Sequence, residues 1–170
     1  MYRKSQIRGL AATGAVFAAR RGQHGLKTDT PDIMLIHELG KFVARTRYDY
    51  LPPAVVETVK LRVLDLLAAG LAGYYMGCHR QLLPVLGGAP EATVWGAGTR
   101  IALRDAVLVN SFISHALYLD DGSRFTGGHP SSVVIPSALG LGETRHAGGR
   151  ELIAAVAAGY EIFLRLGRAI

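Results

Sequence analysis

The chain has 170 residues, of which 49% are hydrophobic, and a formal net charge of +6 at pH 7. This length and composition are ordinary for one globular domain, and the single cysteine, Cys78, excludes an internal disulfide and a cysteine-based metal cage and favours a reducing compartment. The positive charge lies in residues 1–28, which carry six basic residues and no acid, so the remainder is neutral overall and a basic nucleic-acid-binding domain is excluded.

Residues 1–31 are predicted to form a basic extension ahead of the folded domain. Residues 1–28 are rich in alanine, glycine and arginine, which fits an organellar transit peptide, although a disordered extension or an upstream start codon is the simpler explanation. We therefore expect a cytoplasmic protein, with a mitochondrial location as the alternative if the extension is a transit peptide. No apolar run approaches the ~20 residues that a membrane-spanning helix needs, so we expect no membrane partner.

Residues 32–170 are predicted to form a helical domain. Apolar residues recur at helical spacing from Asp32 to about Arg45, and Pro52-Pro53 separates this helix from a second one that runs to residue 75. A short helix over residues 80–86 and a small hairpin follow, with 91–96 as one strand and 99–102 as its return. Three more helical patterns cover residues 103–118, 133–145 and 151–170. The fold is therefore predicted to be mainly α, a bundle of about five helices with one small β-hairpin.

Two features of the last helices concern their ends. Ser131 or Ser132 is expected to cap the helix over residues 133–145, because a serine side chain can accept one of the first free N–H groups. The final helix runs to Ile170 without a stop signal. We therefore expect the chain to be a truncated form of a longer domain.

The loop over residues 117–132 concentrates ionisable side chains between two apolar segments. Asp120 and Asp121 are consecutive, so their side chains point in different directions and need separate roles. One can hold an imidazole or an arginine, while the other faces the cleft as an acceptor or base. A solvated turn would also account for Asp-Asp-Gly, but with the neighbouring residues the loop is interpreted as a candidate catalytic site.

His129 is the member of this loop suited to proton transfer, because an imidazole gives and takes protons near neutral pH. It stands where a helix begins, so the free N–H groups near Ser131 and Ser132 and the helix dipole favour a bound anion. Arg124 can supply a second contact to the same anion. A carboxylate or phosphate ligand is therefore predicted, with these three residues as binding residues.

His115, one turn before the loop, completes the candidate set as a binding residue, interpreted as a partner within the packed helix rather than as a proton donor. His115, Asp120, Asp121 and His129 also offer the nitrogen and oxygen ligands of a metal shell. The sequence has no compact metal-binding spacing such as H-E-x-x-H. We therefore predict no metal.

Several short motifs follow one another in a fixed order along residues 33–170. They are Tyr48-x-x-Leu-Pro-Pro-x-Val-Val, Leu64-Asp-x-Leu-x-Ala-Gly-Leu-Ala-Gly73, Gly87-Gly-x-Pro-Glu-Ala-Thr-Val-x-Gly96, Ala106-x-x-Val-Asn110, His115-Ala-Leu-x-x-Asp-Asp121, His129-Pro-Ser131 and Ala158-Gly-Tyr-Glu161, followed by Arg165-x-Gly-Arg168. In their order and spacing the chain resembles the MmgE/PrpD family, which includes 2-methylcitrate dehydratase, cis-aconitate decarboxylase and iminodisuccinate epimerase.

The resemblance implies a helical domain that supplies half of an active site, closed in the family by a smaller α/β lid domain that we expect to be missing from this chain. It implies a lyase, either a hydro-lyase or a decarboxylase, or an isomerase that acts on small di- or tricarboxylates by proton abstraction next to a carboxylate. No metal or organic cofactor is implied. Family members commonly dimerise through the helical domain, so a homodimer is expected.

The resemblance also assigns roles within the loop. His129 matches the family's active-site histidine, and Asp120 or Asp121 would orient it or act as base. The family has an aspartate at the position of Tyr118 and a threonine at that of Gly122, so Tyr118 would assist as an acid or hydrogen-bond donor. The alternative is a catalytically inactive helical module, or a gene fragment, that self-associates or pairs with a separate lid-domain polypeptide.

Overall fold

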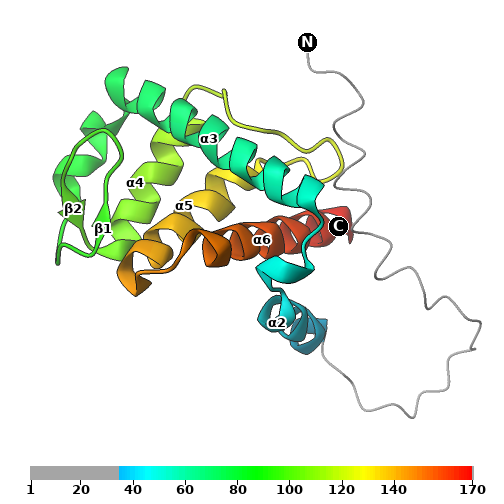
Figure 1. Ribbon diagram of the computed structural model, residues 1–170. Helices are drawn as coiled ribbons and strands as arrows, with labels where there is room; N and C mark the ends of the chain where they lie inside the picture. The colour runs from blue at the N-terminus through cyan, green and yellow to red at the C-terminus, as the bar shows by residue number, and fades with distance from the viewer. Residues whose placement is uncertain (1–34, 170) are drawn as a thin grey trace, which may run out of the picture.

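The structure, a computed structural model, describes residues 35–169. The basic extension predicted at residues 1–31, the start of the first predicted helix and Ile170 lie outside the described residues. The α-helices are α2 (Leu35–Arg45), α3 (Pro53–Tyr75), α4 (Leu103–His115), α5 (Pro130–Arg145) and α6 (Gly149–Ala169) (Figure 1). Short 3-10 turns lie at η3 (Tyr48–Tyr50), η4 (Cys78–Gln81) and η5 (Leu83–Val85).

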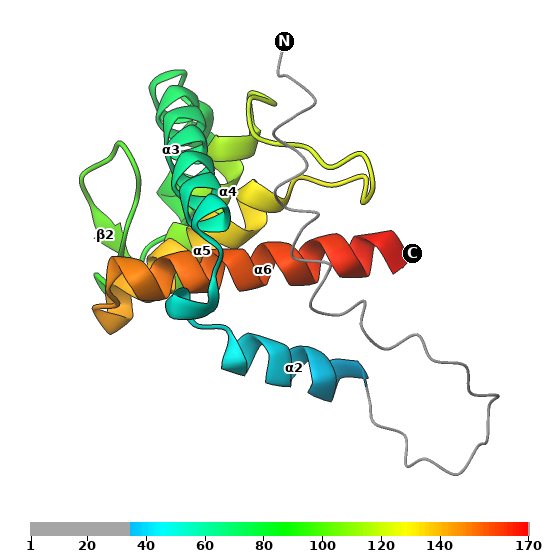
Figure 2. The same cartoon turned by 45° about the vertical axis from the view of Figure 1, so that its right-hand side comes forward.

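The predicted mainly α fold with one small hairpin is confirmed for the described residues. Strand β1 (Ala92–Thr93) pairs antiparallel with β2 (Arg100–Ile101), in the register Ala92 with Ile101. In the two views, α6 lies between α2 on one side and the α3–α5 layer on the other (Figure 2). Residues 80–86, predicted as one short helix, form η5 and part of η4 instead.

Helix α3 begins with Pro53, whose fixed φ suits the first turn and whose missing N–H costs nothing there. Its two interior glycines mark where it packs closely on other parts of the chain. A Cβ on Gly73 would stand 2.0 Å from the carbonyl oxygen of Ile113, and one on Gly70 would stand 2.8 Å from the ring of Trp95. Gly73 therefore allows α3 and α4 to pack closely, and Gly70 leaves room for the ring of Trp95.

The core consists of two clusters of buried apolar side chains. The first joins α3, α5 and α6 and contains Val55, Val59, Leu66, Ile135, Val156 and Tyr160. The second joins the hairpin to α4 and contains Ala92, Val94, Ala106, Val109 and Ile113. Trp95 packs against both clusters, so the hairpin and the helices share one continuous interior.

Polar side chains fasten the hairpin to the helices. Asn110 of α4 accepts the N–H of Trp95 and donates to the carbonyl of Thr93, both at 2.9 Å. Glu143 of α5 accepts the N–H of Thr93 at 2.9 Å and its hydroxyl at 2.6 Å. A two-residue strand pair is marginal by itself, so these contacts hold it in place.

Two helix ends differ from the sequence prediction. Helix α4 ends at His115 rather than near residue 118, because the backbone turns back at Tyr118, which has φ +53°. Helix α5 begins at Pro130, and the predicted serine cap is wrong: neither serine side chain caps it, and its first turn is satisfied by Asp121, which accepts the N–H of Ser131 at 3.0 Å. Ser132 instead donates its hydroxyl to the carbonyl of His129 at 3.1 Å.

One face of α3 carries exposed apolar side chains at helical spacing: Leu61, Leu64, Leu71 and Tyr75. Together with exposed Leu108 and Phe112 of α4, they form apolar surface that the described residues leave uncovered. None of the helices within residues 35–169 has the length and apolar character required to cross a bilayer. Exposed apolar residues arranged in a stripe are typical of an interaction surface.

Candidate functional site

Asp120 lies at the centre of the candidate site. Its side chain is fully buried, and its carboxylate oxygens lie 3.0 and 3.1 Å from Nδ1 of His115. Nδ1 of His129 lies 3.4 Å from Oδ2 of the same carboxylate. The last residue of α4 and the residue just before α5 are therefore joined by one carboxylate, an arrangement that orients both rings.

The intervening loop makes this meeting possible by reversing twice. The positive φ of Tyr118 turns the chain back after α4, and the N–H of Ser123 bonds to the carbonyl of Gly128 at 2.9 Å to close a tight turn. Gly127 within that turn has φ +62°, which glycine adopts at little cost. A Cβ on Gly128 would lie 2.9 Å from the ring of Phe163, so the loop packs directly on α6.

The two imidazoles and the phenol of Tyr118 form an aromatic group. The ring centroids of His115 and His129 are 4.6 Å apart, and that of Tyr118 lies 4.8 Å from His115 and 6.1 Å from His129. Tyr118 is 75% exposed, whereas the histidine side chains are about one third exposed, at 39% and 35%. Because Nδ1 of each imidazole faces Asp120, Nε2 of each ring is left to exchange a proton with a bound molecule.

The two histidines and Asp120 could also hold a cation. His115, Asp120 and His129 each offer one ligand atom, and these atoms lie within 4.8 Å of one another. Two imidazoles and one carboxylate are a donor set that suits several divalent metals. The contacts of His115 Nδ1 with the carboxylate at 3.0 and 3.1 Å have the lengths of hydrogen bonds.

Asp121 belongs to a second network behind the first. Its side chain is 6% exposed and takes three partners: the N–H of Ser131 at 3.0 Å, the hydroxyl of Tyr160 at 3.0 Å and Nη1 of Arg62 at 3.2 Å. Burial and the Asp121 carboxylate raise the pKa of Tyr160 far above its usual range, so the phenol stays protonated and donates. The network fixes the start of α5 against α3 and α6.

The two acids thus have different partners, as their adjacency in the sequence indicated. Asp120 holds imidazoles and Asp121 holds an arginine, but both carboxylates are buried, whereas the sequence suggested that one would face the cleft. Burial is tolerated because each carboxylate has several donors or cations beside it. Asp121 occupies the N-terminal turn of α5, where the sequence predicted an external anion.

The other predicted binding residues have different surroundings in the structure. His115 joins the Asp120 cluster, and Ser131 and Ser132 are buried at the start of α5. Arg124 is exposed in the turn closed by Ser123 and Gly128 and makes no hydrogen bond or ion pair within residues 35–169. The structure therefore brings His115, Tyr118, Asp120 and His129 into contact, and Arg124 has no hydrogen bond or ion pair with this group.

Arg62 and Tyr160 are the residues of the site that the sequence reasoning missed. Neither residue is among the candidate site residues that the sequence predicts. The signal available for Tyr160 was its place in Ala158-Gly-Tyr-Glu161, a motif that recurs with the others in the family. For Arg62 a single arginine within an apolar helix offered no comparable signal.

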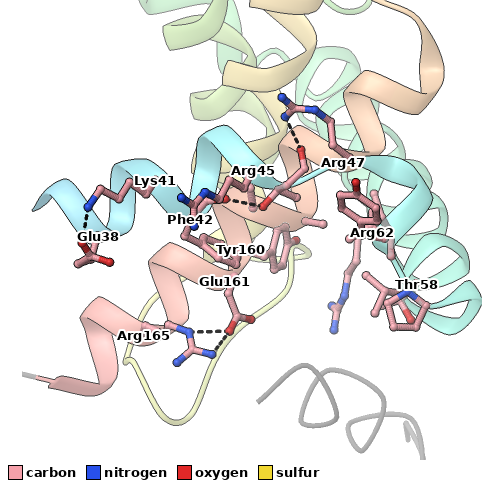
Figure 3. Close-up of a pocket in the computed structure, with 18 residues that line it drawn as sticks. Glu38, Lys41, Phe42, Arg45, Arg47, Thr58, Arg62, Tyr160, Glu161 and Arg165 are labelled. Carbon is pink, nitrogen blue, oxygen red and sulfur yellow. Dashed lines mark hydrogen bonds and ion pairs between the residues drawn. The ribbon is translucent and has the colours of Figure 1, made fainter. Parts of the chain in front are cut away.

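A cavity of about 480 Å³ lies on the other side of these two residues (Figure 3). Its lining comes from α2, η3, α3 and α6 and includes Arg62 and Tyr160, which also contact Asp121. Residues drawn from both ends of the described chain therefore form its walls. Arg62 and Tyr160 connect this cavity to the network at the start of α5.

A bundle whose buried carboxylate aligns two imidazoles defines a candidate acid–base site on a helical domain. A sequence profile described as the MmgE/PrpD N-terminal domain matches residues 37–170, and the chain belongs to the MmgE/PrpD family. The chain is similar to the cis-aconitate decarboxylase-like protein oryM of Aspergillus oryzae, with 26% identity over 151 residues. That match covers 83% of this chain and 31% of oryM. No solved structure matches the chain.

Proposed function

We propose that the chain is the N-terminal helical part of a cofactor-free lyase or isomerase that acts on a small di- or tricarboxylate. The observation that carries the proposal is the contact of one buried carboxylate, Asp120, with Nδ1 of both His115 and His129. Membership of the MmgE/PrpD family and similarity to a decarboxylase-like protein support the substrate class. The match covers 31% of that relative, so the activity of a whole protein is part of the proposal.

His129 is the residue that we assign to proton transfer. Nδ1 of His129 lies 3.4 Å from Oδ2 of Asp120, a charge contact rather than a hydrogen bond, and this leaves Nε2 to take a proton from the carbon next to a substrate carboxylate and to return one later. The negative charge of Asp120 stabilises the imidazolium that forms when His129 takes the proton. His115 shares the same carboxylate and holds Asp120 in the orientation that His129 needs.

Tyr118 takes the role of the proton donor to the developing product. Its ring lies beside both imidazoles and is exposed, so it borders any molecule bound at His129. A phenol donates a hydrogen bond at neutral pH but is a poor base, whereas an aspartate at this position would be ionised. The chain is therefore expected to differ in substrate or reaction from family members that have the acid.

Arg124, in its exposed turn, is the cation that we assign to a substrate carboxylate. The amide of Ser131 is taken by Asp121 and the hydroxyl of Ser132 by a backbone carbonyl, so we assign these two serines to the start of α5 rather than to direct substrate contact. Asp121 positions the helix that follows His129. The substrate site proposed here is completed by groups outside the described residues.

The exposed stripe on α3 favours a second candidate function. Leu61, Leu64 and Leu71 are 60%, 65% and 40% exposed, and burying them against a second copy or a separate lid-domain polypeptide would remove them from water. A catalytically inactive helical module would use this stripe in the same way. A homodimer is proposed under either function, so association alone does not distinguish them.

Turnover distinguishes the two functions. The chain is expressed and tested, alone and with any polypeptide that copurifies, on 2-methylcitrate, cis-aconitate and aspartate-derived dicarboxylates. His129→Asn is expected to lower the rate by about 10²–10⁴, the usual effect of losing a proton-transfer group. The matched control is His146→Asn, since His146 has φ +52° at the end of α5 and asparagine tolerates that conformation. Equal rates for the two variants would rule out the role of His129.

A further inference from the structure

The cavity between α2, α3 and α6 has no assigned occupant in the proposed reaction. Its volume of about 480 Å³ lies within the range of about 300–1,000 Å³ found for small-molecule sites. It is separated from the histidine cluster by Arg62 and Tyr160, which line it on one side and contact Asp121 on the other. A molecule in this cavity would therefore not touch His129.

The interior of the cavity is apolar. Its walls come from the end of α2, the segment that leads into α3, and one face of α6 (Figure 3). The apolar lining residues are Phe42, Leu51, Pro52, Val55, Val59, Ala157 and Ala158. Such walls favour a hydrocarbon chain over a fully polar molecule, because they offer a polar ligand few partners for its hydrogen bonds.

Positive charge collects around these apolar walls. Five cationic and two acidic side chains line the cavity, and the acids Glu38 and Glu161 are paired with Lys41 and Arg165. Arg62 shares Asp121 with other donors. The lining therefore keeps an excess of positive charge.

Arg45 and Arg47 carry most of this excess. The guanidinium of Arg47 donates to the backbone carbonyls of Ala44 and Thr46, at 2.6 and 3.1 Å, and neither acceptor is charged. Arg45 lies in the last turn of α2 and lines the same cavity. A carboxylate placed between these two arginines would meet cations without displacing an ion pair of the lining.

We propose that the cavity binds a single-chain amphipathic carboxylate, with its alkyl chain against Val55, Val59 and Ala158 and its carboxylate at Arg45 and Arg47. A neutral hydrocarbon would leave the cations without a counter-charge, and a small polycarboxylate would leave the apolar walls in water. A second copy of this chain would bring the same excess of positive charge against itself. Charge and polarity together therefore select an anion with a long apolar tail.

Calorimetric titration of the 170-residue chain with decanoate and with 1-decanol, both below their aggregation concentrations, tests the proposal. One variant removes the charges with Arg45→Gln and Arg47→Gln together. The matched control, Arg80→Gln with Arg104→Gln, removes two exposed cations outside the cavity. His129→Asn is titrated as well, so that loss of the proposed proton-transfer group and loss of this site are measured separately.

We expect saturable binding of one decanoate per chain. The Kd is expected to rise at least tenfold when the two cavity arginines are changed and to stay within twofold of the native value in the matched control and in His129→Asn. Decanol is expected to bind at least tenfold more weakly than decanoate. Failure of the native chain to bind decanoate, or equal binding of decanoate and decanol, would overturn the proposal.

A second variant tests the position of the alkyl chain. Thr58 lines the cavity from α3 and is partly exposed, so Thr58→Trp places an indole in the space without replacing a core residue. Decanoate binding is expected to fall at least tenfold while the far-UV circular dichroism spectrum stays native. Undiminished binding in this folded variant would overturn the assigned position. If the chain remains a dimer by mass in the presence of decanoate and binds none of it, a second copy covers the cavity. This result would overturn the proposal too.

Discussion

Tyr160→Phe is expected to destabilise the fold, because it removes a hydrogen bond within the candidate site. The hydroxyl of Tyr160 donates to the buried carboxylate of Asp121 at 3.0 Å, and Tyr160 itself is 5% exposed. A hydrogen bond to a charged group contributes about 1.5–3 kcal/mol, and its removal leaves Asp121 with one fewer donor in a buried setting. We therefore expect the free energy of unfolding to fall by about 1.5–3 kcal/mol at pH 7.

The difference between the two chains should depend on pH in a defined direction. Burial and the Asp121 carboxylate raise the pKa of Tyr160, so the native state keeps the phenol proton where the unfolded chain releases it, above about pH 10. The unfolded state then binds fewer protons than the native state, and this contribution to stability falls as the pH rises. Native protein loses up to about 1.4 kcal/mol per pH unit through this group, whereas the variant loses nothing through it.

Urea denaturation followed by far-UV circular dichroism, at pH 7 and above pH 10, measures both effects. The control is Tyr118→Phe, because the ring of Tyr118 is 75% exposed and its hydroxyl makes no hydrogen bond to the described residues. This control is expected to change stability by less than about 0.5 kcal/mol. Equal unfolding of the two variants at pH 7, or a stability deficit of Tyr160→Phe that grows above pH 10, would refute the stabilising role of this hydrogen bond.

Three further predictions concern the frame around the site. Glu143→Ala should lower stability by about 1–3 kcal/mol in urea denaturation, because Glu143 accepts two hydrogen bonds from the first hairpin strand, and a change below about 0.5 kcal/mol would contradict this. Gly73→Ala should lower the Tm, because the new Cβ would lie 2.0 Å from a backbone oxygen of α4. Gly40→Ala is the control and should raise the Tm, because its Cβ meets nothing within 4 Å. Equal Tm shifts in the two variants would contradict the close packing at Gly73. Native chain should be a dimer in light scattering at micromolar concentration, and Leu61→Glu with Leu64→Glu should reduce it to a monomer; a native monomer near 18.2 kDa would contradict the assigned interface.

The helices could be predicted from the sequence because their apolar residues recur at helical spacing, and Pro53 marks the start of α3. The hairpin followed from a β-prone segment between glycines. The start of α5 could not be predicted, because its cap is supplied by Asp121, ten residues earlier, and depends on how the loop folds back. A local pattern contains candidate serine caps but no sign of the carboxylate that replaces them.

The candidate site likewise has features that the sequence could predict and others that it could not. The sequence placed His115, Asp120, Asp121 and His129 together because they lie within fifteen residues of one another, and the structure brings three of them into one cluster. Tyr160 is 39 residues from Asp121 in the chain, so its contribution depends on the packing of α6 against the loop. Contacts of this kind follow from the tertiary fold and have no periodic signal in the sequence.

The central claim is that Asp120 prepares His129 to move a proton next to a substrate carboxylate. The rate at which deuterium from D2O enters that carbon of a dicarboxylate substrate, followed by NMR, measures this step directly. Asp120→Asn keeps the size of the side chain but removes its charge, and we expect the rate to fall by about 10²–10⁴ relative to native protein. Asp65→Asn, an exposed change on α3, should leave the rate unchanged. Exchange by a folded Asp120→Asn variant at the native rate would contradict the account.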